Sequence, residues 1–401
     1  MRKLIETLVC VTILTGACGN TRTSITLTTT ITAPTTTVIS TFSVSATHHT
    51  SLEITDAGGK WPSIAIGDDG NPVISHYDAT NQSLKLYICD DSQCSTGTNR
   101  VLEVIDGASS FSSVAIGDDG NPVIAHHDQV VEGRPWDFHL DLYICDDSKC
   151  SAGTNVTLET GDFVGKFPSL AIGHGGNPVI SHYDALHQDL ELYVCDDSKC
   201  SAGTNTTLET IGDVGYFSSV AIGDNGNPVI AHHDDSYGDL ELYVCDNAAC
   251  STGTNTVLET TADTGKWPSV VIGDGGNPII AHYDYTEHDL ELYVCADAAC
   301  LTGTNKVLAS LGDVGNYSSL AIDNDGNPVV SYYNVSNLNL EIYVCNDSKC
   351  STGAKRSLGL SGNIGALPKI AISDTGNPII VSHNSKAGTL IFTKVEIPPN
   401  P

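Results

Sequence analysis

Short apolar and β-branched stretches separated by turn residues run through most of the chain. One period holds four of them, at 167–173 (FPSLAIG), 177–184 (NPVISHYD), 190–195 (LELYVC) and 206–210 (TTLET). In 190–195 apolar and polar residues alternate cleanly, which is typical of a β-strand with two different faces. Gly and Asp-Gly at the joints favour tight hairpin turns. The pattern therefore predicts an all-β protein built from four-stranded antiparallel sheets.

The same pattern returns about every 50 residues. The tripeptide Gly-Asn-Pro occurs seven times, with its Asn at positions 71, 121, 177, 227, 277, 327 and 377, so that one spacing is 56 residues and the others are 50. Four strands in a period of about 50 residues are typical of a β-propeller blade. We therefore predict a seven-bladed β-propeller.

The two ends of the repeat region indicate how the ring closes. The seventh repeat has strand patterns at 368–373, 377–384 and 390–397 but no fourth strand, whereas 51–55 (SLEIT) has a fourth-strand pattern and no blade of its own. Placing 51–55 beside 390–397 completes the last blade and leaves no open sheet edge. A solenoid would instead carry polar caps. The propeller domain is predicted over 51–401.

The first fifty residues do not share this pattern. Residues 1–18 have a basic start, a short apolar run at 8–14 and the sequence LTGAC, which together predict a signal peptide of the lipoprotein type. Cys18 would be the lipidated first residue, and ordinary signal cleavage is the alternative. Residues 19–50 are rich in Thr and Ser and predict a disordered linker. The protein is expected outside the cytoplasm, lipid-anchored to the cell envelope or secreted.

The chain is strongly acidic. It has 18 Lys and Arg against 48 Asp and Glu, a formal net charge of -30. Such a charge argues against nucleic acid and against an anionic membrane surface as partners. We expect a soluble monomer that meets a membrane only through its lipid anchor.

Twelve of the fourteen cysteines form six C-x4-C pairs, each at the end of the third strand of a repeat. An exported chain meets an oxidising compartment, so a disulfide is predicted within each pair. Each loop offers two thiols and no nearby His, too few ligands for zinc. The predicted disulfides are Cys89–Cys94, Cys145–Cys150, Cys195–Cys200, Cys245–Cys250, Cys295–Cys300 and Cys345–Cys350.

The repeat also resembles a known group of propellers. The order Pro-Ser-x-Ala-Ile-Gly, Asp-Gly-Asn-Pro, aliphatic strand and Leu-x-Leu-Tyr resembles the NHL-type repeat, and it is similar to secreted bacterial propellers with DGNPVIS-Y-D repeats. The resemblance covers 51–401 and implies a fold rather than a chemistry. No repeat contains the Asp box of sialidase-like propellers, Ser-x-Asp-x-Gly-x-x-Trp.

The propeller connectivity sorts the loops onto two faces. The GDDGNP turns and the CDDSKC loops share one face, here called the bottom. Calcium could be attracted by the paired carboxylates Asp68 and Asp69, Asp118 and Asp119, and Asp323 and Asp325. A full oxygen-ligand loop is absent from the sequence, and Asp-Gly-Asn is ordinary hairpin chemistry. We therefore predict no metal and no cofactor, with calcium as the alternative.

The opposite face, here called the top, gathers the candidate site. In five repeats the second strand ends in His-x-Asp, which places both side chains on one face of the strand. The first strands begin with aromatic residues in six of the seven repeats. Each His could bond to the neighbouring blade and be oriented by its Asp, or the ring could bind a ligand. The predicted ligand-binding residues are His76, Asp78, His126, Asp128, His182, Asp184, His232, Asp234, His282 and Asp284.

One loop breaks the sevenfold repetition. The second repeat has six extra residues within 129–140 (QVVEGRPWDFHL), on the predicted top face. Arg134 and Trp136 in this loop could stack on a sugar ring or bind a peptide carboxylate. The alternative is a lid that fills the channel mouth.

These observations favour a binding function over catalysis. We predict a recognition module that binds a glycan or an extracellular protein on the top face. One alternative is a polysaccharide lyase or hydrolase that uses His and Asp at the channel mouth as acid and base, although the sequence fixes no unique pair. The other alternative is a structural scaffold of the cell envelope.

Overall fold

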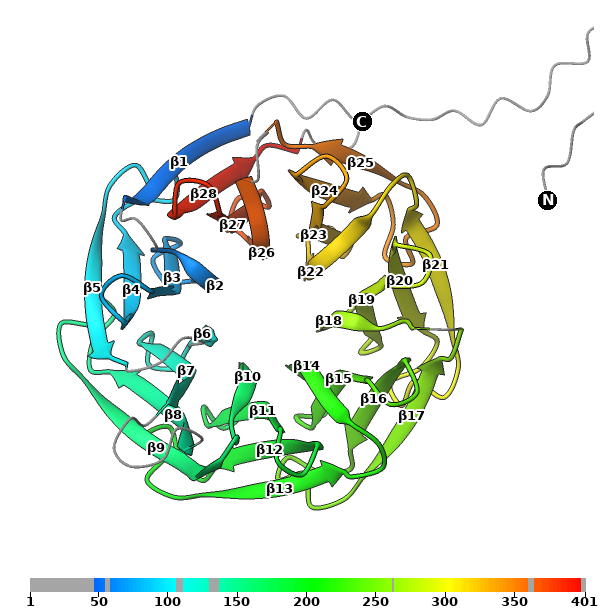
Figure 1. Cartoon of the computed structure of the whole chain (residues 1–401), viewed down its shortest axis with the longest axis horizontal. Helices are drawn as coiled ribbons and strands as arrows, with labels where there is room; N and C mark the ends of the chain where they lie inside the picture. Colours follow the sequence, from blue (N-terminus) through cyan, green and yellow to red (C-terminus); the bar gives the residue numbers. More distant parts are fainter. Residues whose placement is uncertain are drawn as a thin grey trace, which may run out of the picture. The chain divides into compact units, whose positions relative to one another are not determined.

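The computed structural model describes residues 47–54, 58–105, 111–129, 137–261, 263–359 and 364–397. All the regular elements of these ranges are β-strands, which form seven four-stranded antiparallel sheets arranged in a ring (Figure 1). The predicted all-β seven-bladed propeller is therefore confirmed. In the ranges described, no helix has the length and apolar character needed to cross a membrane.

The strands of each blade follow one another from the axis outward. Blades 1 to 4 consist of β2 (Lys60–Ile66), β3 (Pro72–Asp78), β4 (Ser83–Cys89) and β5 (Gly97–Val104); β6 (Ser112–Ile116), β7 (Pro122–Gln129), β8 (Asp137–Cys145) and β9 (Gly153–Asp162); β10 (Lys166–Ile172), β11 (Pro178–Asp184), β12 (Asp189–Cys195) and β13 (Gly203–Glu209); and β14 (Val214–Ile222), β15 (Pro228–Asp234), β16 (Asp239–Cys245) and β17 (Gly253–Glu259). Blades 5 to 7 consist of β18 (Lys266–Ile272), β19 (Pro278–Asp284), β20 (Asp289–Cys295) and β21 (Gly303–Ala309); β22 (Val314–Ile322), β23 (Pro328–Asn334), β24 (Asn339–Cys345) and β25 (Gly353–Ser357); and β26 (Ile364–Ile372), β27 (Pro378–Asn384), β28 (Thr389–Val395) and β1 (Thr47–Ile54).

The N-terminal strand closes the ring, as the sequence predicted. β1 pairs antiparallel with β28, from Thr47 opposite Val395 to Ile54 opposite Thr389. The strand begins at Thr47, whereas the prediction placed residues up to 50 in a disordered linker. His49 holds this extension in place: its Nδ1 accepts a hydrogen bond from Thr393 Oγ1 (3.0 Å) and its Nε2 donates to the Leu358 carbonyl (2.9 Å). The signal peptide, Cys18 and residues 19–46 of the linker lie outside the described residues.

The hydrophobic core lies between neighbouring blades. Between blades 1 and 2, for example, Leu84 and Leu86 on β4 pack with Val114 and Ile124 of the next blade, and all four are buried. Apolar side chains from both sheets leave water at each such interface, which is the main stabilising contribution. The same arrangement recurs around the ring, so each blade is stable only beside its neighbours.

A belt of serines joins the blades close to the axis. In six blades a serine on the innermost strand accepts a hydrogen bond at Oγ from a backbone N–H of the next blade. The pairs are Ser63 with Val114, Ser113 with Leu170, Ser169 with Val220, Ser219 with Val270, Ser269 with Leu320 and Ser319 with Ile370, all between 3.0 and 3.2 Å. Blade 7 has Lys369 at this position, and a lysine side chain cannot accept such a bond.

All six predicted disulfides are present. They join Cys89–Cys94, Cys145–Cys150, Cys195–Cys200, Cys245–Cys250, Cys295–Cys300 and Cys345–Cys350. Each closes the loop between the third and fourth strands on the bottom face. Their sulfur-bearing residues are buried against the core between blades.

Reduction of these bridges is expected to destabilise the propeller without changing its topology. Closing a loop of this size contributes about 2 kcal/mol per bridge in the chain-entropy model. The double variant Cys345→Ser/Cys350→Ser should therefore unfold at a lower denaturant concentration than the wild type, as measured by circular dichroism. Blade 7 shows that a blade can form without a bridge, so the variant should still fold. An unchanged midpoint would show that the bridge adds no stability.

Candidate functional site

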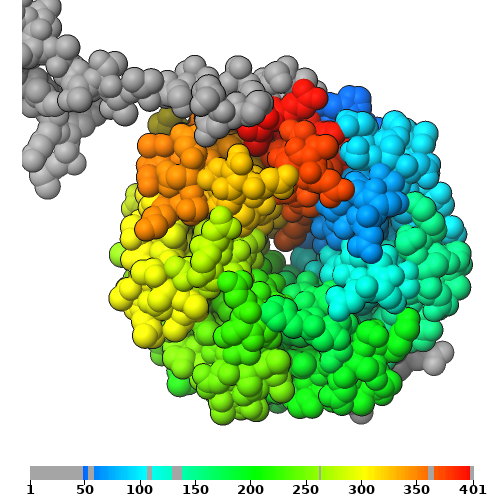
Figure 2. Space-filling model, turned by 180° about the vertical axis from the view of Figure 1, so that it is seen from behind, coloured from blue at the N-terminus to red at the C-terminus, as the bar shows by residue number. Residues whose placement is uncertain are grey.

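The start of each innermost strand brings one bulky side chain to the central channel. Six of these residues are aromatic, and their rings contact one another in turn around the channel. We call this ring the aromatic collar; its members are Trp61, Phe111, Phe167, Phe217, Trp267 and Tyr317, with Leu367 of blade 7 as the seventh residue. Successive aromatic ring centroids are 4.0 to 5.7 Å apart, and Trp61 and Tyr317 on either side of Leu367 are 6.5 Å apart. Figure 2 shows the opening at the centre of the ring.

Local backbone geometry positions the collar. The pairing of the first and second strands shifts at this point, for example between Lys60 and Ser63, which is a β-bulge. Trp61, Phe167, Phe217, Trp267, Tyr317 and Leu367 all have positive φ between 49° and 55°. Bulky residues rarely adopt this conformation, which costs on the order of 1 kcal/mol or more each. Bulges of this kind re-aim a side chain, and strained residues cluster at binding sites. The sequence predicted these aromatic residues at the top mouth but not the geometry that holds them.

The collar leads into a cavity of about 140 Å³ on the channel axis. Besides the collar, its walls are formed by prolines and by serines of the belt. Lys369 is the one charged residue among those lining this cavity in the described structure. Its side chain is open to the channel but surrounded by protein atoms, and this desolvation lowers the pKa of its ammonium group. The cavity is thus apolar at its mouth and carries one cation deeper in.

Three further lysines directly precede collar residues on the innermost strands: Lys60, Lys166 and Lys266. Lys266 Nζ forms an ion pair with Asp263 (3.0 Å) and lies 4.4 Å from the centroid of the Tyr285 ring. Lys166 Nζ lies 5.1 Å from the centroid of the Phe163 ring. Lysines therefore border the mouth, and the charge of Lys266 is balanced by Asp263 and Asp235.

The five predicted histidines lie elsewhere, in the interfaces between blades. His76, His126, His182, His232 and His282 are fully buried, and none lines the channel cavity. Each Nε2 donates to the Oδ1 of an asparagine on the fourth strand of the same blade, at 3.2 to 3.4 Å. These partners are Asn99, Asn155, Asn205, Asn255 and Asn305. The expected ring of histidines around the channel mouth does not form, because this face of the second strand turns toward the neighbouring blade.

The aspartates of the His-x-Asp motif serve the adjacent turns. Asp184 Oδ1, for instance, accepts hydrogen bonds from the backbone N–H groups of Leu186 (2.8 Å) and His187 (3.1 Å). Asp78, Asp234 and Asp284 cap the corresponding turns in the same way. Asp128 precedes the longer loop of blade 2 and lies at the end of β7. The motif thus combines an interface histidine with a turn-capping carboxylate, and does not form an acid–base pair.

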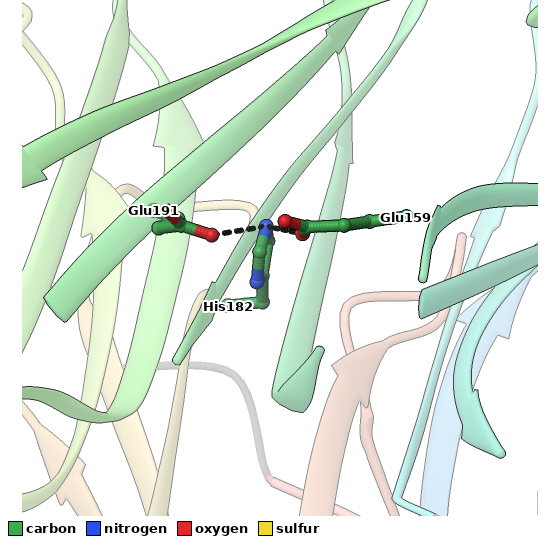
Figure 3. Close-up of side chains that lie close together, drawn as sticks. All are labelled: Glu159, His182 and Glu191. Atoms are coloured by element: carbon green, nitrogen blue, oxygen red, sulfur yellow. Dashed lines mark ion pairs between the residues drawn. The ribbon is translucent and has the colours of Figure 1, made fainter. Parts of the chain in front are cut away.

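One interface group has a composition suited to a metal ion. His182 Nε2 lies 3.4 Å from Glu159 Oε2, contributed by blade 2, and 3.8 Å from Glu191 Oε2 of its own blade (Figure 3). Burial raises the pKa of Glu159 to about 7, with the charge of Glu191 as the next cause, and burial lowers the pKa of His182. A neutral imidazole and two carboxylates could hold a divalent cation.

Hydrogen bonds within the same interface already occupy some of these potential metal-ligand atoms. Asn205 accepts from His182 and donates through Nδ2 to Glu191 Oε2 (3.0 Å), while Thr207 donates to Glu191 Oε1 (3.1 Å). Similar groups recur at other interfaces, where Asn305 donates to both Glu259 and Glu291. We interpret these groups as a polar network that joins the blades.

The acidic turns of the bottom face follow ordinary turn chemistry. Asp69 Oδ1 accepts the backbone N–H of Asn71 (3.0 Å), and Asp119 does the same for Asn121 (3.1 Å). Asp323 likewise accepts from the backbone N–H groups of residues 325 and 327. These contacts account for Asp69, Asp119 and Asp323 as turn-stabilising groups.

The irregular loop of blade 2 lies largely outside the described residues, and so do Arg134 and Trp136. Its described neighbours form a stack, in which the ring of Phe138 lies 4.8 Å from that of His127 and 5.6 Å from that of Phe163. The ligand-binding role of Arg134 and Trp136 stays a prediction.

The top face also exposes aromatic side chains that the sequence reasoning did not single out. Tyr237 and Tyr285, in equivalent loops of blades 4 and 5, are 67% and 51% exposed. Lys369 was missed as well. A comparison of the repeats in the sequence could have identified this residue, because six repeats have serine at the position where the seventh has lysine.

Comparison with known proteins supports the fold. No protein-family model matches the sequence, and no curated protein matches it, so the resemblance to NHL-type repeats rests on the repeat residues alone. A similar solved structure is an ulvan lyase, described as a new family of polysaccharide lyase and bound to -[GlcA(1-4)Rha3S]-, with a TM-score of 0.61, 10% identity and coverage of 86% of this chain and 95% of that chain. Another is an α-L-arabinanase of Penicillium chrysogenum complexed with arabinobiose, with a TM-score of 0.49, 12% identity and coverage of 87% and 97%.

Proposed function

We propose that the protein is a glycan-recognition module that takes a saccharide unit at the aromatic collar. The observation that carries this proposal is the collar itself, six contacting aromatic rings at the mouth of an open channel. Sites for small ligands are concave and lined by aromatic side chains, with a few polar groups that fix orientation. The collar supplies the apolar surface, and the serines and Lys369 below it supply the polar groups.

The exposed surface around the collar adds support. Tyr237 and Tyr285 project from the loops of two neighbouring blades on the same face, and an exposed aromatic ring with a polar tip suits a ligand that is partly apolar and partly hydrated. The ulvan lyase that shares the propeller fold binds a saccharide, which is consistent with a glycan partner. An extracellular protein bound on this face is the alternative partner.

We also propose that the protein acts outside the cytoplasm. The six disulfides indicate an oxidising compartment. Attachment through a lipid on Cys18, a monomeric state and function without a cofactor complete the proposal.

The catalytic alternative has weaker support. A lyase or hydrolase needs an acid and a base within reach of the substrate. The His-x-Asp motifs do not supply such a pair, because their histidines are buried between blades and four of their aspartates cap turns. A purely structural scaffold would need neither the strained collar nor the channel lysine.

Trp267→Leu is expected to weaken saccharide binding about tenfold. Leucine occupies the same position in blade 7, so the variant should fold, but it removes an aromatic stacking surface worth on the order of 1 kcal/mol. Binding would be measured by isothermal titration calorimetry with saccharides selected from a glycan array. Val257→Ala, on the outer edge strand β17, is the matched control and should bind like the wild type. Absence of any saccharide ligand for the wild type, or unchanged binding by Trp267→Leu, would contradict the proposal.

A further inference from the structure

We propose that Lys369 binds the carboxylate of a uronic acid unit in the channel below the aromatic collar. This inference rests on the proposed glycan-binding function and specifies its ligand as an acidic saccharide. Four observations support it: the exceptional position of Lys369, the lack of a partner for its charge, the distribution of charge over the protein and the size of the cavity.

The position of Lys369 is exceptional within the repeat. At the equivalent place, six blades have a serine whose Oγ accepts a hydrogen bond from the next blade. Lys369 cannot accept this bond, so the seam between blades 7 and 1 lacks a contact that all the other seams have. A lysine that replaces a structural serine at one place in a sevenfold repeat gives up stability, which is typical of a functional residue.

The ammonium group of Lys369 lacks a counter-charge. Within the described part of the chain it forms no ion pair, and desolvation in the channel lowers its pKa. Its side chain is exposed to the channel, so its ammonium group can form a charge-assisted hydrogen bond with an anion that enters there. Because the channel is open, a carboxylate that enters through the collar would supply the missing partner.

Lys369 is the one charged side chain among those that line the described channel cavity, so an anion in this cavity meets a cation and no carboxylate. The protein carries a formal net charge of -30, so an acidic polymer is repelled by most of its surface. The collar is instead bordered by Lys60, Lys166 and Lys266, and Lys369 lies below it. An acidic saccharide would therefore find its cationic contacts at the mouth and within the channel.

The cavity size restricts the ligand further. Its volume of about 140 Å³ is well below the roughly 300–1,000 Å³ of sites that enclose drug-sized ligands. The cavity therefore accommodates a single sugar unit or its carboxylate group, and a longer oligosaccharide would extend over the collar onto the top face. We accordingly expect recognition of a single uronic acid unit.

The test compares a charged saccharide with its neutral counterpart. The full chain is titrated by calorimetry with an oligosaccharide that ends in glucuronate, and with the same oligosaccharide after reduction of its carboxyl groups to alcohols. The wild type should bind the acidic form at least about tenfold more tightly. Lys369→Ser should lose this preference and bind both forms with the affinity of the wild type for the neutral one. Because six blades carry serine at this position, the variant is expected to fold.

Two further variants complete the test. Lys369→Arg keeps the charge and should keep most of the preference for the acidic form. Lys199→Ser makes the same charge change in an exposed loop of the bottom face and should behave like the wild type. Equal binding of both saccharides by the wild type, or a preference that persists in Lys369→Ser, overturns the role of Lys369 and leaves the proposed function standing. Binding of neither saccharide by the wild type overturns the proposed function and this inference with it.

Discussion

A chain that begins at residue 58, and so lacks β1, is expected to be less stable by on the order of 5 kcal/mol and to self-associate. Without β1, blade 7 keeps three strands and the backbone of β28 becomes an open edge. The core would also lose Leu52, which packs against Leu390 and Phe392. Unpaired edge strands are templates for association between chains. Denaturant unfolding and sedimentation velocity would measure the two effects.

The matched control is a chain that begins at Thr47, which keeps β1 entire and should unfold like the full-length protein. His49→Ala provides a milder change, since it removes the hydrogen bonds to Thr393 and Leu358, and it should lower stability by about 1–2 kcal/mol. Equal unfolding midpoints for the chains that begin at 47 and at 58 would show that β1 does not close the ring.

Acidification from pH 7 to about pH 4.5 is expected to destabilise the propeller. Burial lowers the pKa of His76, His232 and His282 to about 4, from 6.5 in the unfolded chain. Between these values the unfolded chain takes up protons that the folded state does not, so stability is present above pH 6.5 and is lost as the pH falls toward 4. Each histidine contributes on the order of 3 kcal/mol to this loss. The pKa values of His126 and His182 are also lowered by burial.

Eight described carboxyl groups act in the opposite direction, because burial raises their pKa: Glu103, Glu159, Asp189, Asp234, Asp239, Glu241, Asp289 and Glu291. Burial raises the pKa of Glu103 and Glu159 to about 7, so these groups favour the folded state below their unfolded value of 4.5 and cease to do so as the pH rises through 7. Eight described histidines have a pKa that burial lowers, three of them to about 4, whereas two of the eight carboxyl groups reach about 7, so a net destabilisation in acid is the expected result. The groups near His232 include Glu241, at 3.6 Å, Asn255 and the titratable side chain of His233.

Urea unfolding at pH 7.5, 5.5 and 4.5 would measure this dependence. His232→Gln removes one titrating group from the interface, so the fall in stability should be smaller than in the wild type. His174→Gln, in an exposed bottom turn, should leave the dependence unchanged. A wild-type stability that does not fall between pH 6.5 and 4.5 would contradict the assignment of the histidines to buried interfaces.

Much of the fold could be predicted because short sequence patterns determine it. The 50-residue period, the C-x4-C pairs and the missing fourth strand of the last repeat each have a direct structural counterpart. The start of β1 could not be predicted in this way. Residues 47–51 (THHTS) are polar, and their strand conformation is imposed by the open edge of β28 rather than by their own propensity.

The site was predicted only in part, for a geometric reason. Alternation correctly places His182 and Asp184 on one face of β11, but it does not show whether that face turns toward the channel or toward the next blade. The asparagines that bond to the histidines are on outer strands, where polar residues are expected at the surface anyway. The collar was found because its aromatic residues stand at the starts of the innermost strands, whichever way the blades twist.

Contacts in the interface between blades 5 and 6 explain why the sixth repeat differs in sequence from the others. Five fourth strands have a glutamate opposite a leucine of the third strand, whereas blade 5 has Ala309 there. Across that interface the repeated His and Asn are replaced by Tyr332 and Lys355. Tyr332 Oη donates to Glu341 Oε2 (2.9 Å), and Lys355 Nζ lies 3.7 Å from the same atom. The interface thus exchanges one balanced set of partners for another, which supports the interpretation of these groups as structural.

The pairing of β1 with β28 has a consequence for how the chain is made. β1 is synthesised before any other strand, and its partner Thr393 lies 344 residues beyond His49. The N-terminal blades can assemble during translation, but the ring cannot close until the last strand has left the ribosome. β1 stays unpaired throughout this time. Because residues 47–51 are Thr, His and Ser, the unpaired strand exposes little apolar surface to other incompletely folded chains.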